Sequence, residues 1–170
     1  MTYGTNRKTM DENICRSKLQ HREFYSGYGN IDDSPATAIY LKRTDGSQCF
    51  YLPEYTVMGV HGIFTVGNVT DAYSTSTVEH IEIAFLAFRD TGGNVTIVID
   101  PATPQTEAIA TIVPTANTTV QGFEILVNYV GTPDVTTVYA SGWLDFVITN
   151  ELTYKNRMPA AGTAARTTAE

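Results

Sequence analysis

The stretch "VEHIEIAFLAFR" at residues 78–89 decides the fold class, because its apolar residues recur at every second position. Ile81, Ile83 and Phe85 fall on one face, as they do in a β-strand that buries one side. From Ala84 to Phe88 both faces are apolar, and such a strand is usually covered on both sides. The pattern therefore predicts a strand within a sheet that packs against a second layer.

Similar segments occur along the chain and are separated by turn signals. The predicted strands are 38–43 and 48–52 (paired as a hairpin), 55–66 (bent or broken at Gly59 and Gly62), 78–89, 95–100, 107–114, 118–130, 135–140 and 143–149. Alternation predicts these inward-facing side chains: Val95, Ile97, Ile99, Phe123, Ile125, Val127, Tyr129, Leu144, Phe146 and Ile148. Trp143 then falls on the face opposite Leu144 and Phe146.

These strands favour an all-β domain built as a two-sheet β-sandwich. The chain has 170 residues, of which 42% are hydrophobic, and this is enough for the core of one domain. The number of strands and the long polar loop at 67–77 favour a jelly-roll topology over an immunoglobulin-like one.

The two ends differ from the strand-rich middle. Residues 1–37 are mostly polar and are predicted to form an extended N-terminal arm, and Thr9 and Glu12 match a capping box for one short helix over about 10–23. Residues 155–170 are small and polar and are predicted to form a C-terminal tail. The predicted organisation is therefore an arm at 1–37, a β-sandwich domain at 38–154 and a tail at 155–170.

The net charge of −7 is unevenly distributed. Residues 1–43 hold seven basic and five acidic side chains, and residues 155–170 hold three and one. Residues 44–154 hold one base, Arg89, against twelve acids. Opposite fields orient partners, so the arms of one subunit are predicted to lie on the body of the next. The acidic body argues against nucleic acid as the main partner.

The sequence predicts no catalytic residue, no metal site and no cofactor. The histidines, His21, His61 and His80, have no metal-ligand spacing, although a metal shared by His61 and His80 is the alternative to two hydrogen-bonded side chains. Cys15 and Cys49 are predicted to be reduced thiols. No apolar run is long enough for a membrane helix, and no signal peptide is recognisable at the N-terminus. A last alternative is an aromatic sugar-binding platform of Trp143, Tyr139, Tyr129 and Tyr73.

In its organisation the chain resembles phage virion proteins, specifically the small capsid decoration (cement) proteins. The resemblance rests on the polar arm at 1–37, the strands at 38–150 and the small-residue tail "AAGTAARTTAE" at 160–170. It implies a non-enzymatic structural protein that binds copies of itself and a major capsid protein, and that stabilises the shell. It also implies a location in the virion after synthesis in the host cytoplasm. The alternative is a carbohydrate- or receptor-binding β-sandwich module of a phage tail or fibre.

The residues predicted to contact a partner lie at the two ends of the chain. Polar segments gain order by binding a partner surface, which directs the prediction to the arm and the start of the tail. The predicted contact residues are Tyr3, Arg7, Lys8, Ile14, Arg16, Leu19, Arg22, Phe24, Tyr25, Tyr28, Lys155, Arg157 and Met158.

Overall fold

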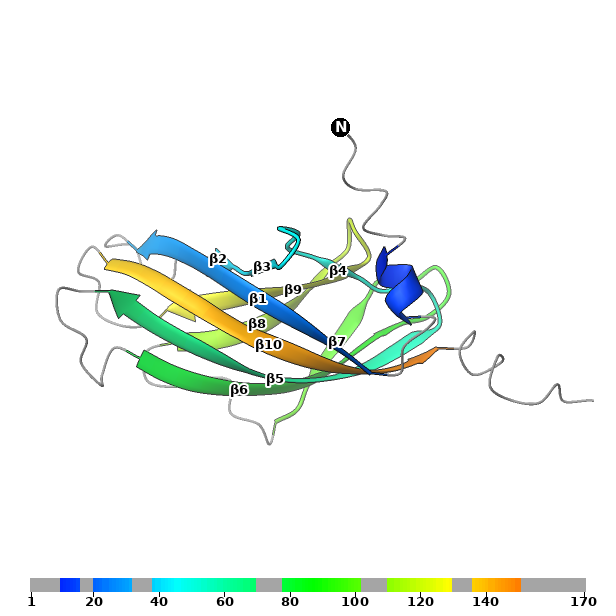
Figure 1. Cartoon of the computed structure of the whole chain (residues 1–170). Helices are drawn as coiled ribbons and strands as arrows, with labels where there is room; N and C mark the ends of the chain where they lie inside the picture. The colour runs from blue at the N-terminus through cyan, green and yellow to red at the C-terminus, as the bar shows by residue number, and fades with distance from the viewer. Residues whose placement is uncertain are drawn as a thin grey trace, which may run out of the picture.

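The computed structural model describes residues 10–15, 20–31, 38–69, 78–101, 110–129 and 136–150. Residues 10–15 are helical, and the other described segments form ten strands (Figure 1). The strands are β1 (Gln20–Ile31), β2 (Ala38–Tyr40), β3 (Lys42–Arg43), β4 (Phe50–Tyr51), β5 (Thr56–Val69), β6 (Val78–Arg89), β7 (Thr96–Ile99), β8 (Ala110–Asn117), β9 (Gly122–Tyr129) and β10 (Thr136–Asn150).

The strands form two antiparallel sheets that lie one in front of the other in Figure 1. The larger sheet has the strand order β3-β1-β10-β5-β6-β7. In the smaller sheet β8 pairs with β9 along the whole of β9, so β2 and β4 share the other edge of β9 at its two ends. The predicted all-β sandwich of two sheets is therefore confirmed, whereas the preference for a jelly-roll topology stays a prediction.

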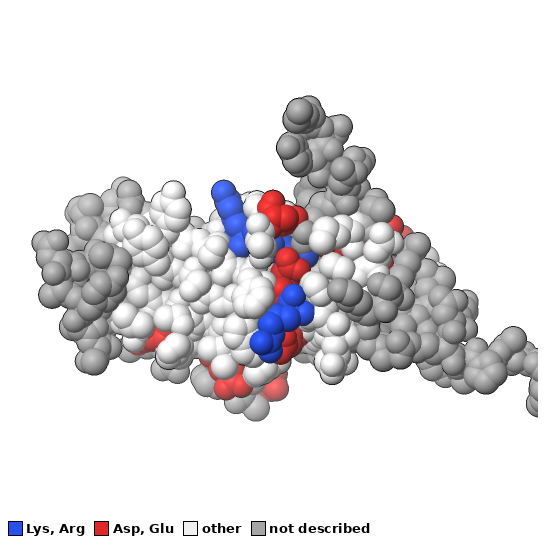
Figure 2. Space-filling view, viewed as in Figure 1, with Lys and Arg blue, Asp and Glu red and all other residues white. Residues whose placement is uncertain are grey.

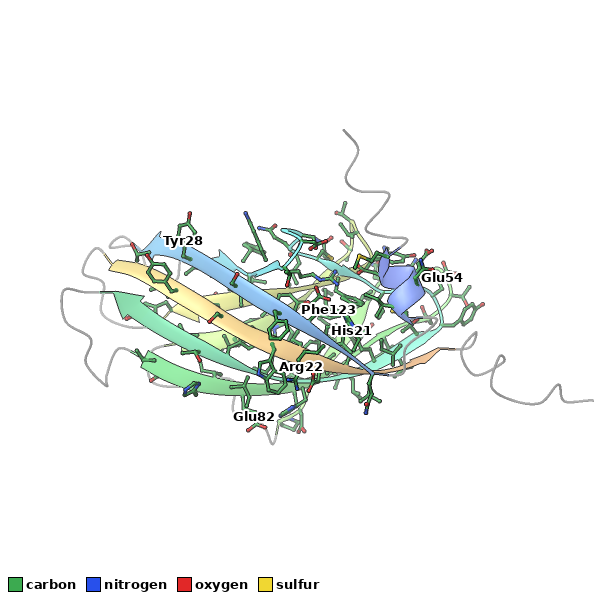
Figure 3. The ribbon with its side chains drawn as sticks, viewed as in Figure 1. His21, Arg22, Tyr28, Glu54, Glu82 and Phe123 are labelled. Atoms are coloured by element: carbon green, nitrogen blue, oxygen red, sulfur yellow. The ribbon has the colours of Figure 1, made fainter. Side chains whose placement is uncertain are left out.

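The core lies between the sheets and is rich in phenylalanine. Phe123 of β9, labelled in Figure 3, lies 5.5 Å from Phe50 and 5.5 Å from Phe85, between ring centroids. Phe146 of β10 contacts Phe50 from the opposite sheet, with centroids 4.9 Å apart. Most of the predicted inward-facing residues are buried, but Ile99 is 41% exposed because it ends the short edge strand β7.

The predicted arm at 1–37 is wrong over residues 20–31, because these residues form β1 inside the larger sheet. All twelve residues of β1 pair with β10, from Gln20 opposite Val147 to Ile31 opposite Thr136. The helix is also shorter than predicted, since residues 20–23 belong to β1. The predicted tail at 155–170 lies outside the described residues.

The sequence of β1 lacks the apolar alternation of a core strand because some of its inward side chains belong to a buried charge cluster. Its inward positions include His21 and Glu23, and Glu23 Oε2 lies 3.0 Å from Nη2 of buried Arg43. Arg43 Nη1 donates to both oxygens of buried Asp11 in the helix, at 3.1 and 3.0 Å. Asp11 also accepts a 2.9 Å hydrogen bond from the Tyr51 amide. The cluster ties the helix, β1, β3 and β4 together in the place of apolar contacts.

The long strands are continuous. Residues 56–66 lie in one strand, β5, so the predicted break at Gly59 and Gly62 is absent, and residues 136–140 and 143–149 join in β10. Gly62 and Gly142 allow this, because a Cβ atom at either would collide with the carbonyl of the neighbouring strand. The predicted hairpin of 38–43 with 48–52 is also wrong, since β2 and β4 both pair with β9 and β3 pairs with β1.

Candidate functional site

The outer face of the larger sheet holds nine of the fourteen exposed large hydrophobic side chains among the described residues. This face is called the outer face below. No described residue covers it, and the second apolar side of β6 faces outward there, with Leu86 48% exposed. The nine side chains are Phe24, Tyr28, Val57, Ile63, Val78, Leu86, Val98, Tyr139 and Val147.

A stripe of charge crosses the middle of the outer face. Arg22 of β1 donates two 2.6 Å hydrogen bonds to Asp145 of β10, and its guanidinium lies 4.1 Å from the centroid of the Trp143 ring. In the next two strands His61 Nε2 lies 2.6 Å from Glu82 Oε1. Figure 2 shows this stripe as a narrow band of blue and red on a mostly white face, and Figure 3 labels Arg22 and Glu82 on it. The hydrogen bond from Arg22 lowers the pKa of Asp145 below its ordinary value.

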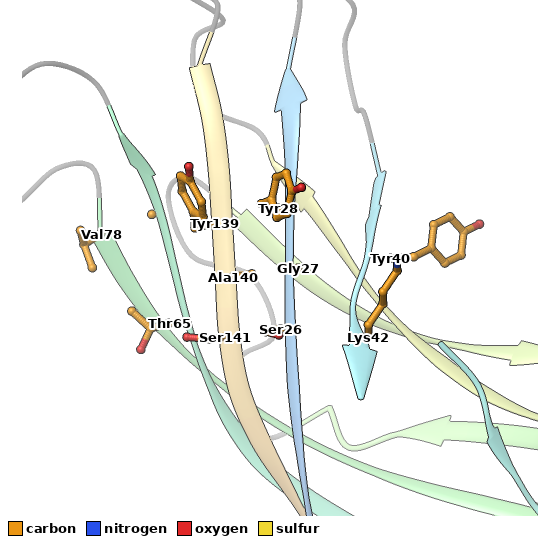
Figure 4. Close-up of a pocket in the computed structure, with 11 residues that line it drawn as sticks. Ser26, Gly27, Tyr28, Tyr40, Lys42, Thr65, Val78, Tyr139, Ala140 and Ser141 are labelled. Carbon is orange, nitrogen blue, oxygen red and sulfur yellow. The ribbon is translucent and has the colours of Figure 1, made fainter. Parts of the chain in front are cut away.

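On one side of the stripe the outer face carries aromatic rings and hydroxyl groups. Tyr28 and Tyr139 are opposite each other on β1 and β10, and their rings stack with centroids 6.0 Å apart (Figure 4). Phe24 and Trp143 form the next aromatic pair towards the stripe. Ser26 and Ser141 lie between the two pairs. A hollow of about 950 Å³ opens beside Tyr28 and Tyr139, and a second of about 670 Å³ opens beside Phe24 and Trp143. Ser26, Thr65 and Ser141 line both hollows, which together are called the trough below.

On the other side of the stripe the outer face is aliphatic. Leu86 of β6 is opposite Val98 of β7 and Gly59 of β5, and Gly59 is opposite Val147 of β10. Val57 continues the same face one step along β5, at 49% exposed. Because Gly59 has no side chain, a shallow groove of about 550 Å³ lies between Leu86 and Val147. The four side chains Val57, Leu86, Val98 and Val147 are called the aliphatic patch.

The structure places the predicted contact residues in three groups. Arg22, Phe24 and Tyr28 lie on the outer face, where a partner can reach them. Ile14 and Tyr25 are in the core instead, because the helix packs on the sandwich and Tyr25 faces inward from β1 against Phe64. The remaining ones, Tyr3, Arg7, Lys8, Arg16, Leu19, Lys155, Arg157 and Met158, lie outside the described residues.

Sequence reasoning missed most of the outer face because it assigned binding to the ends of the chain. Trp143 was correctly placed opposite Leu144 and Phe146, and Tyr139 lies on the same face. Tyr129, from the predicted sugar platform, is buried at 5% exposed, and Tyr73 lies outside the described residues. The outer face follows from the alternation of inward and outward residues in β10 once the strands beside β10 are known. The pairing of β1 with β10, however, cannot be read from the sequence.

No three His, Cys, Asp or Glu side chains gather as metal ligands within the described part of the chain. His61 pairs with Glu82, and Nδ1 of His80 lies 3.0 Å from Thr65 Oγ1, so each imidazole has its own neighbour. No disulfide joins Cys15 and Cys49 in the structure.

The two thiols are expected to be unreactive in the folded protein. Burial raises the pKa of Cys15 and of Cys49 from 9.0 to about 12, and nearby carboxylates add to the shift. Thiolate therefore forms in the folded chain only as the pH approaches 12, whereas the unfolded chain ionises near 9. At pH 8.5 we expect iodoacetamide to label both cysteines at least 10-fold faster in 8 M urea than in buffer, as measured by mass spectrometry. Equal rates would contradict their burial.

Comparison of the chain with protein-family models and with curated proteins finds no match. Among the described residues no helix is long and apolar enough to cross a membrane. The site therefore has to be interpreted from its own geometry.

Proposed function

We propose that this chain is a non-enzymatic structural protein of a virion, which decorates and stabilises a capsid by docking on other protein subunits. The observation that carries the proposal is the aliphatic patch, whose side chains are about half exposed on a flat sheet face. Aliphatic side chains have no polar end that benefits from water, and contiguous exposed patches of this kind mark protein interfaces.

The charge stripe supports docking through the same face. Arg22 pairs with Asp145, and Glu82 is hydrogen-bonded to His61, so these side chains beside the aliphatic patch already have partners within the chain. A partner that covers the patch therefore does not bury an isolated charge, which would be costly. The partners are further copies of this chain and a major capsid protein, as the resemblance to capsid decoration proteins implies.

The proposal is tested by a charge placed in the aliphatic patch. Leu86→Lys is expected to weaken self-association and binding to capsids by more than about 10-fold in Kd, because the ammonium group must be desolvated at the interface. The matched control is Val120→Lys, since Val120 is 44% exposed in the turn before β9, away from the outer face.

Self-association is measured by sedimentation velocity, and attachment by cosedimentation with particles purified from the source of the chain. Loss of both in Leu86→Lys, with Val120→Lys equal to the parent, supports the proposal. A parent chain that stays monomeric at high concentration and remains at the top of the gradient beside intact particles overturns it.

A further inference from the structure

We propose that the trough on the outer face binds an acidic saccharide, such as an oligomer that contains hexuronic or sialic acid. The trough lies across the charge stripe from the aliphatic patch, so this site does not depend on the proposed capsid function. The outer face would then carry two separate binding sites, one for a saccharide and one for a protein, on opposite sides of the stripe.

The strand register builds the floor of the trough from one row of polar side chains. Lys42 of β3 is opposite Ser26 of β1, Ser26 is opposite Ser141 of β10, and Ser141 is opposite Thr65 of β5. His80 of β6 ends the row opposite Thr65. Directly opposite residues point to the same side of a sheet, so the row presents an ammonium group, three hydroxyls and an imidazole on one face.

Two rows of mostly apolar and aromatic side chains form the walls. Tyr28, Tyr139 and Val78 lie on one side of the floor, and Phe24, Trp143 and Ile63 lie on the other. Glu82 ends the second row opposite Ile63, and its carboxylate is hydrogen-bonded to His61 of the charge stripe. Each wall is two residues along its strands from the floor, so the walls stand about 13 Å apart at ~3.3 Å per residue. Across the five strands the floor is about 19 Å long at a spacing of ~4.8 Å. This shape fits an extended chain of a few sugar rings.

The chemistry of the lining favours a saccharide over a purely apolar ligand. Sugar rings present C–H groups on their faces and hydroxyls around their edges. The C–H groups pack on aromatic rings such as Tyr28, which is 74% exposed, and Tyr139, while the edges hydrogen-bond to hydroxyls of the floor. Figure 4 shows the two tyrosine rings standing beside each other above β1 and β10, with Ser26 and Ser141 further along the same strands.

Lys42 indicates that the saccharide is acidic. It is the one charged residue, of those that the structure describes, that lines the hollow beside Tyr28 and Tyr139, and it is exposed. Among the described residues no ion pair of Lys42 is found, whereas Arg22, Arg43 and Arg89 each pair with a carboxylate. An exposed ammonium group at the end of a row of hydroxyls is suited to a carboxylate of the ligand.

The test uses the full chain and three probes: tetragalacturonic acid, sialyllactose and the neutral cellotetraose. Isothermal titration in 20 mM salt is expected to show that at least one acidic probe binds at least about 10-fold more tightly than cellotetraose, and that 0.5 M salt removes this preference. Tyr28→Ala with Tyr139→Ala is expected to weaken that binding by at least about 10-fold. Lys42→Gln is expected to bind the acidic probe no more tightly than cellotetraose.

The control variant is Tyr55→Asn, which removes a tyrosine about as exposed as Tyr139 but far from the trough. Tyr55 has a backbone φ of 58°, and asparagine tolerates this left-handed conformation, so the control should fold like the parent. Circular dichroism and a urea titration check that all variants are folded. If no probe binds the parent chain, or if the tyrosine double variant binds as tightly as the control, the proposal is wrong. Equal affinity of the parent for the acidic probes and for cellotetraose would also overturn it.

Discussion

A chain that lacks residues 1–31 is expected not to fold. The larger sheet has the order β3-β1-β10-β5-β6-β7, so the deletion removes β1 from between two other strands. Twelve residues of β10 then have no neighbouring strand on that side, and β3 loses the only strand through which it joins the larger sheet. The deletion also removes Ile14, Cys15 and Tyr25 from the core. The free energy of unfolding of a domain is only about 5–15 kcal/mol, and we expect the loss of these strand pairings and core side chains to exceed it.

Circular dichroism and urea unfolding measure the effect. We expect the truncated chain to lose its β-sheet signal and its cooperative transition. The control is the full chain with Phe24→Ser and Tyr28→Ser, which removes two outward side chains of β1 and leaves its backbone in place. Because both side chains are more than half exposed, this variant is expected to unfold within about 1 kcal/mol of the parent. A truncated chain with the unfolding midpoint of the parent would contradict the role of β1.

This expectation differs from the organisation predicted from the sequence, in which residues 1–37 are an arm outside the sandwich, and the reason lies in β1. Strands such as β6 and β9 could be predicted because Ile81, Ile83 and Phe85, or Phe123, Ile125 and Val127, show an apolar period of two. The inward positions of β1 carry Glu23, Tyr25 and glycines instead. A single-sequence pattern cannot distinguish a buried paired carboxylate from a solvated one, because the partner Arg43 is twenty residues away.

Only part of the candidate site could be predicted, because local sequence shows which side of a strand a residue faces but not which residues lie opposite it. Local alternation placed Trp143 outward, and this is confirmed. The trough, however, needs Lys42, Ser26, Ser141 and Thr65 on four strands to share one row, and only the register sets that row. Register depends on contacts between distant segments, so the composition of the floor could not be predicted from local sequence.

Arg43→Met is expected to cost about 3–5 kcal/mol of the free energy of unfolding. The Arg43 and Asp11 side chains are fully buried, and Glu23 is nearly so. The substitution keeps the apolar stem over the Phe50 ring, where the guanidinium carbon lies 4.4 Å from the centroid. It leaves two carboxylates buried without their cation, and their desolvation is then uncompensated.

The matched control is Arg22→Met, because Arg22 also pairs with an aspartate but on the exposed outer face. The side chains of Arg22 and Asp145 are 50% and 41% exposed, so water replaces the lost partner and the loss of stability is much smaller than in Arg43→Met. Urea unfolding, followed by tryptophan fluorescence, measures the free energy of unfolding of both variants. If Arg43→Met does not fold, Arg43→Lys keeps the charge but not the two-fold hydrogen bonding of Asp11, and an intermediate loss is expected. Equal losses in Arg43→Met and Arg22→Met would show that the cluster does not hold the helix, β1 and β3 together.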